Sequence, residues 1–163
     1  MDINRSVENT LAVSRNEWKQ WATLEIKLEE TLPRVNCLGG EINQVLLNLV
    51  INAAHAIEEA GRGADGKIQV ATRRLDEDRI EISIEDNGVG MTEAVIEQIF
   101  DPFFTTKKIG KGTGQGLSIC RDVIVAKHGG RISVHSTPGV GTRFSVILPI
   151  GEAEEETPKG DNL

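Results

Sequence analysis

The chain has 163 residues, enough for one domain with a hydrophobic core, and 39% of them are hydrophobic and 26% charged, as in ordinary globular proteins. Its net charge of −7 argues against a broad nucleic-acid-binding surface, and no apolar run reaches the length of a membrane span. The two cysteines lack metal-like spacing, so a cytoplasmic setting is the default expectation. We therefore expect no nucleic acid partner and no membrane contact by this domain.

The first predicted elements are a helix over residues 5–20 and a strand over residues 23–30. One side of the helix holds Val7, Leu11 and Val13, and the core side of the strand holds Leu24, Ile26 and Leu28. A helix over 41–60 is the strongest signal in the chain, and glycines follow its end.

The rest of the chain alternates between strands and helices. In order, it predicts strands over 67–74 and 79–86, a short helix over 92–99, a loop over 101–115, a helix over 116–128, and strands over 131–136 and 143–149. This order predicts an α/β two-layer sandwich, in which a mixed, mostly antiparallel sheet packs on about three helices. The domain is predicted over 1–150, and residues 151–163, with five acids and one lysine, read as an acidic disordered tail or linker.

The helix over 41–60 carries two distinct faces. A buried stripe is predicted from Leu46, Val50, Ala53 and Ile57, while Asn48, Asn52 and His55 share another face. An amide oxygen is a ligand that magnesium accepts beside water and phosphate, and a histidine can donate to a phosphate. A plain solvent-exposed face is the alternative, but the apolar neighbours Leu47, Ile51 and Ala54 argue against it.

The strand over 79–86 ends in an aspartate that faces the core. Ile82, Ile84 and Asp86 are spaced by two, so the carboxylate points the same way as the isoleucines and needs a partner. An adenine amino group is a suitable donor, and Gly88 and Gly90 would let the backbone approach a flat base. A capping aspartate in an Asp-Asn-Gly turn explains the same pattern, and the motif alone favours that alternative.

The stretch IGKGTGQGLS (109–118) is rich in glycine, and its spacing excludes two common phosphate loops. Gly112 follows Lys111 where a P-loop needs Ser or Thr, and Gln115, Leu117 and Ile119 break every G-x-G-x-x-G register. The loop instead leads into an amphipathic helix, whose N-terminus suits phosphate. Nearby positive charge comes from Lys107, Lys108 and Lys111.

Taken in order, these motifs resemble the ATP-binding catalytic domain of sensor histidine kinases, in the wider family shared with DNA gyrase, Hsp90 and MutL. NQVLLNLVINAAHAI resembles the asparagine box, DNGVGM the first glycine box, and IFDPFFTTK the phenylalanine box. GTGQGLSI resembles the second glycine box, and TPGVGTRFSVILP the closing hairpin. The resemblance spans about residues 1–150.

This resemblance implies ATP and Mg²⁺ as cofactors. Asn52 would hold the metal with Asn48 beside it, His55 would lie near the phosphates, and Asp86 would bind the adenine amino group. Residues 101–116 would form a flexible ATP lid. The other implied nucleotide-binding residues are Gly88, Gly90, Met91, Lys107, Gly112, Thr113, Gly114, Gln115, Gly116, Leu117 and Thr142. Gln115 departs from the family, which more often has an apolar residue there.

The resemblance also implies a function in a two-component signalling protein. The domain would supply the γ-phosphoryl group to a histidine on a separate dimerisation and phosphotransfer domain upstream, and a response regulator would be an indirect partner. An acid usually follows the accepting histidine in the family, whereas Ala56, Gly129 and Ser136 follow the three histidines here. We therefore expect no autophosphorylation of this chain alone, and the catalytic residues stay unassigned.

Three alternatives remain open from the sequence. The related ATPase clamps place a glutamate where Asn48 stands, so rapid hydrolysis is not expected here. A nucleotide-sensing binding module and a serine kinase are the others, and the intact motifs argue against the former.

Overall fold

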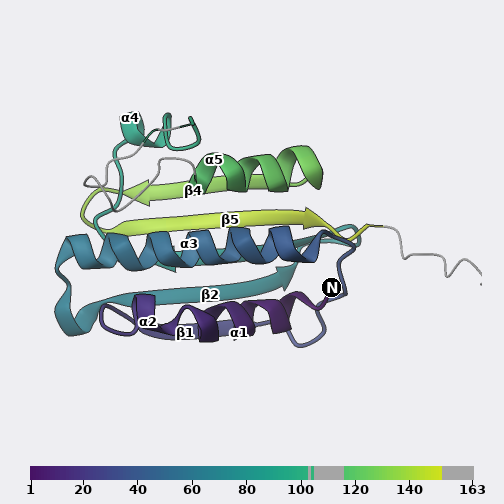
Figure 1. Cartoon of the computed structure of the whole chain (residues 1–163), viewed down its shortest axis with the longest axis horizontal. Coiled ribbons are helices and arrows are strands. Elements are labelled where there is room, and N and C mark those ends of the chain that lie inside the picture. Colours follow the sequence, from purple (N-terminus) through teal and green to yellow (C-terminus); the bar gives the residue numbers. More distant parts are fainter. Residues whose placement is uncertain (103, 105–115, 152–163) are drawn as a thin grey trace, which may run out of the picture.

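The computed structural model describes residues 1–102, 104 and 116–151. They contain a five-stranded sheet in the order β1-β2-β3-β5-β4 (Figure 1). Its strands are β1 (Thr23–Leu28), β2 (Lys67–Arg74), β3 (Arg79–Asp86), β4 (Arg131–Thr137) and β5 (Gly141–Pro149). β1 runs parallel to β2, and the other three pairs are antiparallel, which confirms the predicted mixed sheet.

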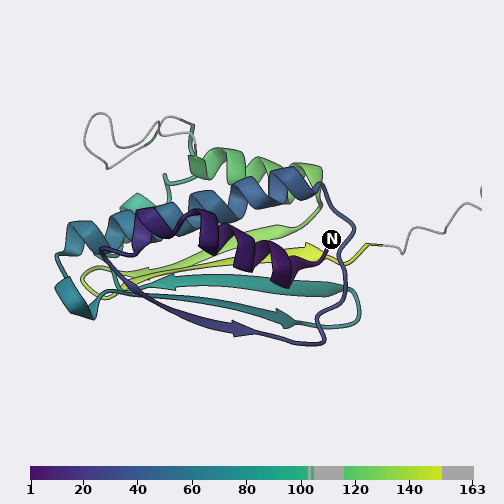
Figure 2. The same ribbon diagram turned by 60° about the horizontal axis from the view of Figure 1, so that its bottom comes forward.

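The helices lie on one side of this sheet and leave its other face open (Figure 2). They are α1 (Ile3–Val13), α2 (Arg15–Trp18), α3 (Gly39–Ala60), α4 (Glu93–Ile96) and α5 (Gly116–Arg121), which continues as the π-helix η2 (Asp122–Lys127); a short 3₁₀ turn, η1 (Gly63–Asp65), precedes β2. The two-layer sandwich is therefore confirmed. The predicted flexible lid and acidic tail fall almost entirely outside the described residues.

The core lies between α3 and the sheet. The predicted stripe of α3 is buried, with Leu46, Val50 and Ala53 each 2% exposed. The isoleucines of β3 meet it from below, because alternate strand residues face the helices. α3 ends at Gly61, whose φ of 62° is the left-handed conformation that commonly terminates helices. This long helix is the frame on which the site is built.

The predicted first helix is divided in two. Ser14 adopts a non-helical conformation between α1 and α2, and its hydroxyl donates to the Thr10 carbonyl over 2.7 Å. Val7 and Leu11 are buried as predicted, but Val13 is exposed, so its placement on that face is wrong. Two residues beyond Leu11 is about 200° around a helix, which turns Val13 away from the core.

The edge strand β1 also departs from expectation. Leu24 and Leu28 pack against the core, but Ile26 is 44% exposed. Among the described strands, β1 pairs only with β2, so one flank of Ile26 has no neighbouring strand to cover it. Ile26 is therefore on the same strand face as Leu24 and Leu28, as predicted, but it is not buried.

Candidate functional site

The end of β3 brings two predicted residues together. Asp86 pairs with Thr142 in the register between β3 and β5, and both are 6% exposed. The Gly88 amide donates to Oδ1 of Asp86 over 2.8 Å, so the capping turn that the motif favoured is present. Burial raises the pKa of Asp86 to about 6, against the opposing hydrogen bonds from the backbone amides of Gly88 and Thr142. The carboxylate is thus capped, buried and costly to ionise.

The glycines after Asp86 are required by close backbone approaches within the protein. A Cβ on Gly88 would lie 2.5 Å from the Ala56 carbonyl carbon, where the Val89 amide donates to the Ala56 oxygen over 3.1 Å. Gly90 has a φ of 68°, and its Cβ would lie 2.0 Å from the Thr137 oxygen. These contacts fix the turn against α3 and against the β4–β5 hairpin. The predicted approach of both glycines to a base stays a prediction.

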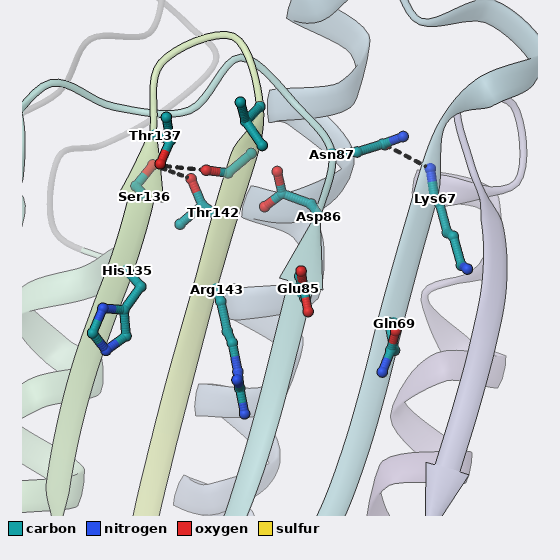
Figure 3. A pocket seen from close by; sticks show the side chains of 12 residues that line it. Lys67, Gln69, Glu85, Asp86, Asn87, His135, Ser136, Thr137, Thr142 and Arg143 are labelled. Atoms are coloured by element: carbon teal, nitrogen blue, oxygen red, sulfur yellow. Dashed lines mark hydrogen bonds between the residues drawn. The ribbon is translucent and has the colours of Figure 1, made fainter.

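Ser136 joins three parts of this region and was not identified from the sequence. Its hydroxyl accepts from the Met91 amide over 2.8 Å and lies 2.8 Å from the hydroxyl of Thr142 (Figure 3). The Gly141 oxygen lies 3.0 Å from the same hydroxyl. A small polar residue two positions before the hairpin turn was the signal available, but serine in a strand is too common to stand out.

A pocket of about 450 Å³ opens beside Asp86 and Thr142 (Figure 3). Gln69, Glu85, Arg143 and His135 form one row across the sheet in it, and this row alternates with the core-facing row that contains Asp86. The pocket therefore reaches the end of the sheet from the open face. Asp86 and Thr142, both predicted to bind the nucleotide, line it, whereas the asparagines of α3 do not.

On α3, the three predicted polar residues are half-buried. The Asn48 amide donates to the Cys120 sulfur over 3.8 Å and accepts from Gln44 over 3.2 Å. A Cβ on Gly116 would lie 4.0 Å from Nδ2 of Asn48, so α5 begins next to this side chain. Asn52 and His55 follow on successive turns towards Ala56, where the Gly88 turn packs. α3 thus runs past both the start of α5 and the Asp86 turn.

α5 begins within the glycine-rich stretch 109–118. Gly116 is its first residue, and Leu117 packs against the core. Arg121 lies over the Phe100 ring, 5.7 Å from its centroid, and so ties this helix to the phenylalanine-rich segment. Burial raises the pKa of Cys120 to about 11, so its thiol stays protonated at neutral pH. The predicted residues Lys107, Gly112, Thr113, Gly114 and Gln115 lie outside the described residues.

Comparison with known proteins assigns the chain to a family. The profile of the histidine kinase-, DNA gyrase B-, and HSP90-like ATPases matches residues 39–152. The sensor histidine kinase ZraS of Klebsiella oxytoca is 37% identical over 158 residues, which cover 96% of this chain and 32% of that protein. The chain thus spans about a third of the length of this relative.

Solved structures agree with this assignment. The catalytic domain of histidine kinase ThkA superposes with a TM-score of 0.78 at 31% identity, covering 92% of this chain and 95% of that one. ThkA in complex with the response regulator protein TrrA matches with a TM-score of 0.74 at 27% identity, covering 93% and 41%. The chain belongs to the histidine kinase-, DNA gyrase B-, and HSP90-like ATPase family, as an ATPase-type catalytic domain of the sensor histidine kinases.

The predicted resemblance to the ATP-binding catalytic domain of protein-histidine kinases is therefore confirmed. The roles of the individual site residues stay predictions. Within the described residues, no helix combines the length and the apolar character that crossing a membrane requires.

Proposed function

We propose that this domain binds Mg²⁺–ATP and supplies the γ-phosphoryl group for a histidine on a separate dimerisation and phosphotransfer domain. The observation that carries this proposal is Asp86, a carboxylate held at 6% exposure at the end of a central strand. A buried carboxylate without a cationic partner is costly, and no salt bridge to Asp86 is found in the described part of the chain. A ligand donor would repay this cost.

The chemistry of Asp86 suits an adenine amino group. A carboxylate offers about four lone-pair sites, and the amides of Gly88 and Thr142 occupy two of them. With its pKa near 6, the group is mostly ionised at neutral pH and accepts hydrogen bonds only. Guanine presents an acceptor at the corresponding position, which a carboxylate would repel. The site therefore favours adenine.

The phosphates would lie between α3 and the start of α5. Asn52 would hold Mg²⁺, with Asn48 beside it and His55 near the phosphates. The metal, when bound, neutralises phosphate charge, which is the main requirement of phosphoryl transfer. Backbone N–H groups at Gly116 and Leu117 would face the phosphates, because the first turn of a helix leaves its amides unpaired.

The accepting histidine and the response regulator are proposed as partners in a two-component system. None of the three histidines in the chain is followed by an acid. The complex of ThkA with a response regulator supports this class of partner for the whole protein. Acid-labile phosphohistidine formed by the purified chain alone with Mg²⁺–ATP would contradict the assignment of the acceptor to another domain.

The alternatives from the sequence are not favoured. An ATPase clamp needs a base at the Asn48 position, and here a neutral amide is held between Gln44 and Cys120. The relatives compared above are histidine kinases, which disfavours a serine kinase and a purely sensory module.

The replacement Asp86→Asn tests the adenine assignment. The amide keeps the size of the side chain but loses the charge and one acceptor, so ADP and ATP should both bind at least about tenfold more weakly. Isothermal titration with Mg²⁺ measures both affinities, and Glu85→Gln, an exposed neighbour on the other face, is the matched control. Affinities within twofold of the unsubstituted chain would show that the assignment is wrong.

A further inference from the structure

The connection between α3 and β2 folds back over the turn that follows Asp86. The Asn87 side chain donates to the Asp65 oxygen over 2.7 Å and accepts from the Lys67 amide over 2.8 Å. The backbone N–H of Asn87 also donates to the Lys67 backbone oxygen over 3.3 Å. The turn is therefore held by the α3–β2 connection as well as by Ala56, whose oxygen accepts from the Val89 amide.

Arg62, in this connection, contacts two segments that are distant in sequence. Its Nε donates to the Asn87 oxygen over 2.9 Å, and its Nη2 donates to the Gly139 oxygen. These acceptors lie 25 and 77 residues along the chain. One belongs to the turn after β3 and the other to the turn between β4 and β5. The guanidinium therefore bridges the two turns.

These two turns carry the residues proposed to surround the base. Asp86, Gly88 and Gly90 lie on or beside the first turn, and Thr142 follows the second. Among the described residues, one backbone–backbone hydrogen bond joins residues 87–90 to residues 138–140. It runs from the Gly139 amide to the Val89 oxygen over 2.7 Å. The bond from the Met91 amide to the Ser136 hydroxyl and the close approach of Gly90 to Thr137 join the same two regions, and the Arg62 bridge adds the charged contacts between the turns.

We propose that Arg62 is a positioning residue for the adenine site, because it fixes the turn after Asp86 against the turn before Thr142. Arginine suits this position because its planar guanidinium presents several donors in a fixed fork and remains charged. A lysine ammonium can reach one carbonyl but does not hold two in a fixed geometry. This inference rests on the proposed function, since it assigns Arg62 to the same base site.

A direct electrostatic role towards phosphate makes different predictions. An arginine that attracts phosphates would affect ATP more than ADP and would leave adenosine unaffected, and lysine would largely replace it. A positioning residue acts on the base, so adenosine, ADP and ATP should all lose the same factor. Lysine should then restore only part of the affinity.

The experiment measures binding of adenosine, Mg²⁺–ADP and Mg²⁺–ATP by calorimetry to the chain and to its Arg62→Ala and Arg62→Lys variants. We expect Arg62→Ala to weaken the binding of all three ligands by a similar factor of about ten, as for the loss of a charge-assisted hydrogen bond. The affinities of Arg62→Lys should lie between those of Arg62→Ala and those of the unsubstituted chain. Arg74→Ala is the matched control. Arg74 bridges two carbonyls in the same way, donating to Asp76 over 2.9 Å and to Glu77 over 3.0 Å, but in the β2–β3 hairpin.

Hydrogen exchange in the absence of nucleotide supplies a second readout. The Gly139 amide, bound to the Val89 oxygen, should exchange faster in Arg62→Ala and Arg62→Lys but not in Arg74→Ala. Unchanged exchange and unchanged affinities in both Arg62 variants, with nucleotide still bound by the unsubstituted chain, would overturn the inference alone. A loss confined to ATP would also overturn it. Failure of the unsubstituted chain to bind any of the three ligands would overturn the proposed function and this inference with it.

Discussion

The base end of the molecule and the helix junction are held together by different forces. At the base end, residues 86–91 and 136–142 are joined by short hydrogen bonds to backbone atoms and by approaches that exclude even a methyl group. At the junction of α3 with α5 and η2, Cys120 and Ile124 are fully buried, and the Asn48 contact is a weak 3.8 Å bond to sulfur. The base end is directional and specific, whereas the junction is mainly apolar packing, which tolerates volume-conserving change.

The largest effect is expected for Gly90→Ala, which would break the base end. The new Cβ would have to occupy a φ of 68° only 2.0 Å from the Thr137 oxygen, so the turn must move. We expect a loss of about 3 kcal/mol or more in the free energy of unfolding, measured by urea denaturation.

Gly129→Ala separates the two causes. Gly129 has a similar φ of 64° with nothing near its Cβ position, so only the conformational strain of about 1–2 kcal/mol applies. Equal losses in the two variants would show that the close approach at Gly90 contributes nothing.

The stability of Asp86→Asn is expected to depend on pH differently from that of the unsubstituted chain. The pKa of Asp86 rises from 3.8 to about 6 on folding, so the native chain takes up a proton between these values and the ionised carboxylate disfavours folding above pH 6. The full shift corresponds to about 3 kcal/mol. Asparagine removes the charge but cannot accept both amides, so we expect a net gain of about 1 kcal/mol at pH 8 that disappears near pH 4.

Denaturation of both chains at the two pH values measures this difference. A gap that does not change with pH would contradict the raised pKa. The expected gain in stability accompanies the loss of nucleotide affinity, so the two measurements together show whether stability is sacrificed for binding at this position.

Cys120→Val tests the tolerance of the junction. Valine keeps the apolar character of the fully buried site but removes the sulfur that accepts from Asn48. We expect a loss of about 1 kcal/mol in the free energy of unfolding and unchanged adenosine affinity. A loss as large as that of Gly90→Ala would mean that the junction is as tightly specified as the base end.

The smallest effect is expected at the rim of the junction. Lys127 and Glu41 form a 2.6 Å ion pair, but both side chains are substantially exposed. Lys127→Ala should change the free energy of unfolding less than any of the preceding variants, because solvent screens an exposed ion pair. His128→Ala is the useful contrast, because His128 accepts from the Leu38 amide over 2.9 Å and its Nδ1 lies 2.7 Å from the Val123 oxygen. His128→Ala should therefore lower the free energy of unfolding more than Lys127→Ala does in the same denaturation measurement.

The sequence predicted best what depends on periodic burial. The strands over 67–74 and 79–86 match β2 and β3, and the stripe of α3 is buried as expected. Interruptions within helices were harder to predict. The division at Ser14 depends on one hydroxyl that bonds within its own turn, and the helix over 116–128 changes at Asp122 to a π-helix that no simple period indicates.

Arg62 shows why part of the site could not be predicted. Its acceptors are backbone carbonyls, which every residue has, and they are brought close only by the folded sheet. Asp86, by contrast, can be recognised in the sequence, because it is a charged residue at a position of β3 whose alternate neighbours are apolar. Side chains that bind side chains or ligands leave a pattern in the sequence, and side chains that bind distant backbone leave none.

The strand order has a consequence for the synthesis of the protein. Of the strands in the described residues, β5 comes last, yet it lies between β3 and β4 and pairs with both along their lengths. A ribosome therefore releases β1, β2 and β3 as a partial sheet with the edge of β3 unpaired, and β4 cannot join until β5 emerges. Through this interval the edge of β3 has no partner strand, and an unpaired strand edge is open to wrong pairing. Asp86 therefore pairs with Thr142 only after β5 has emerged.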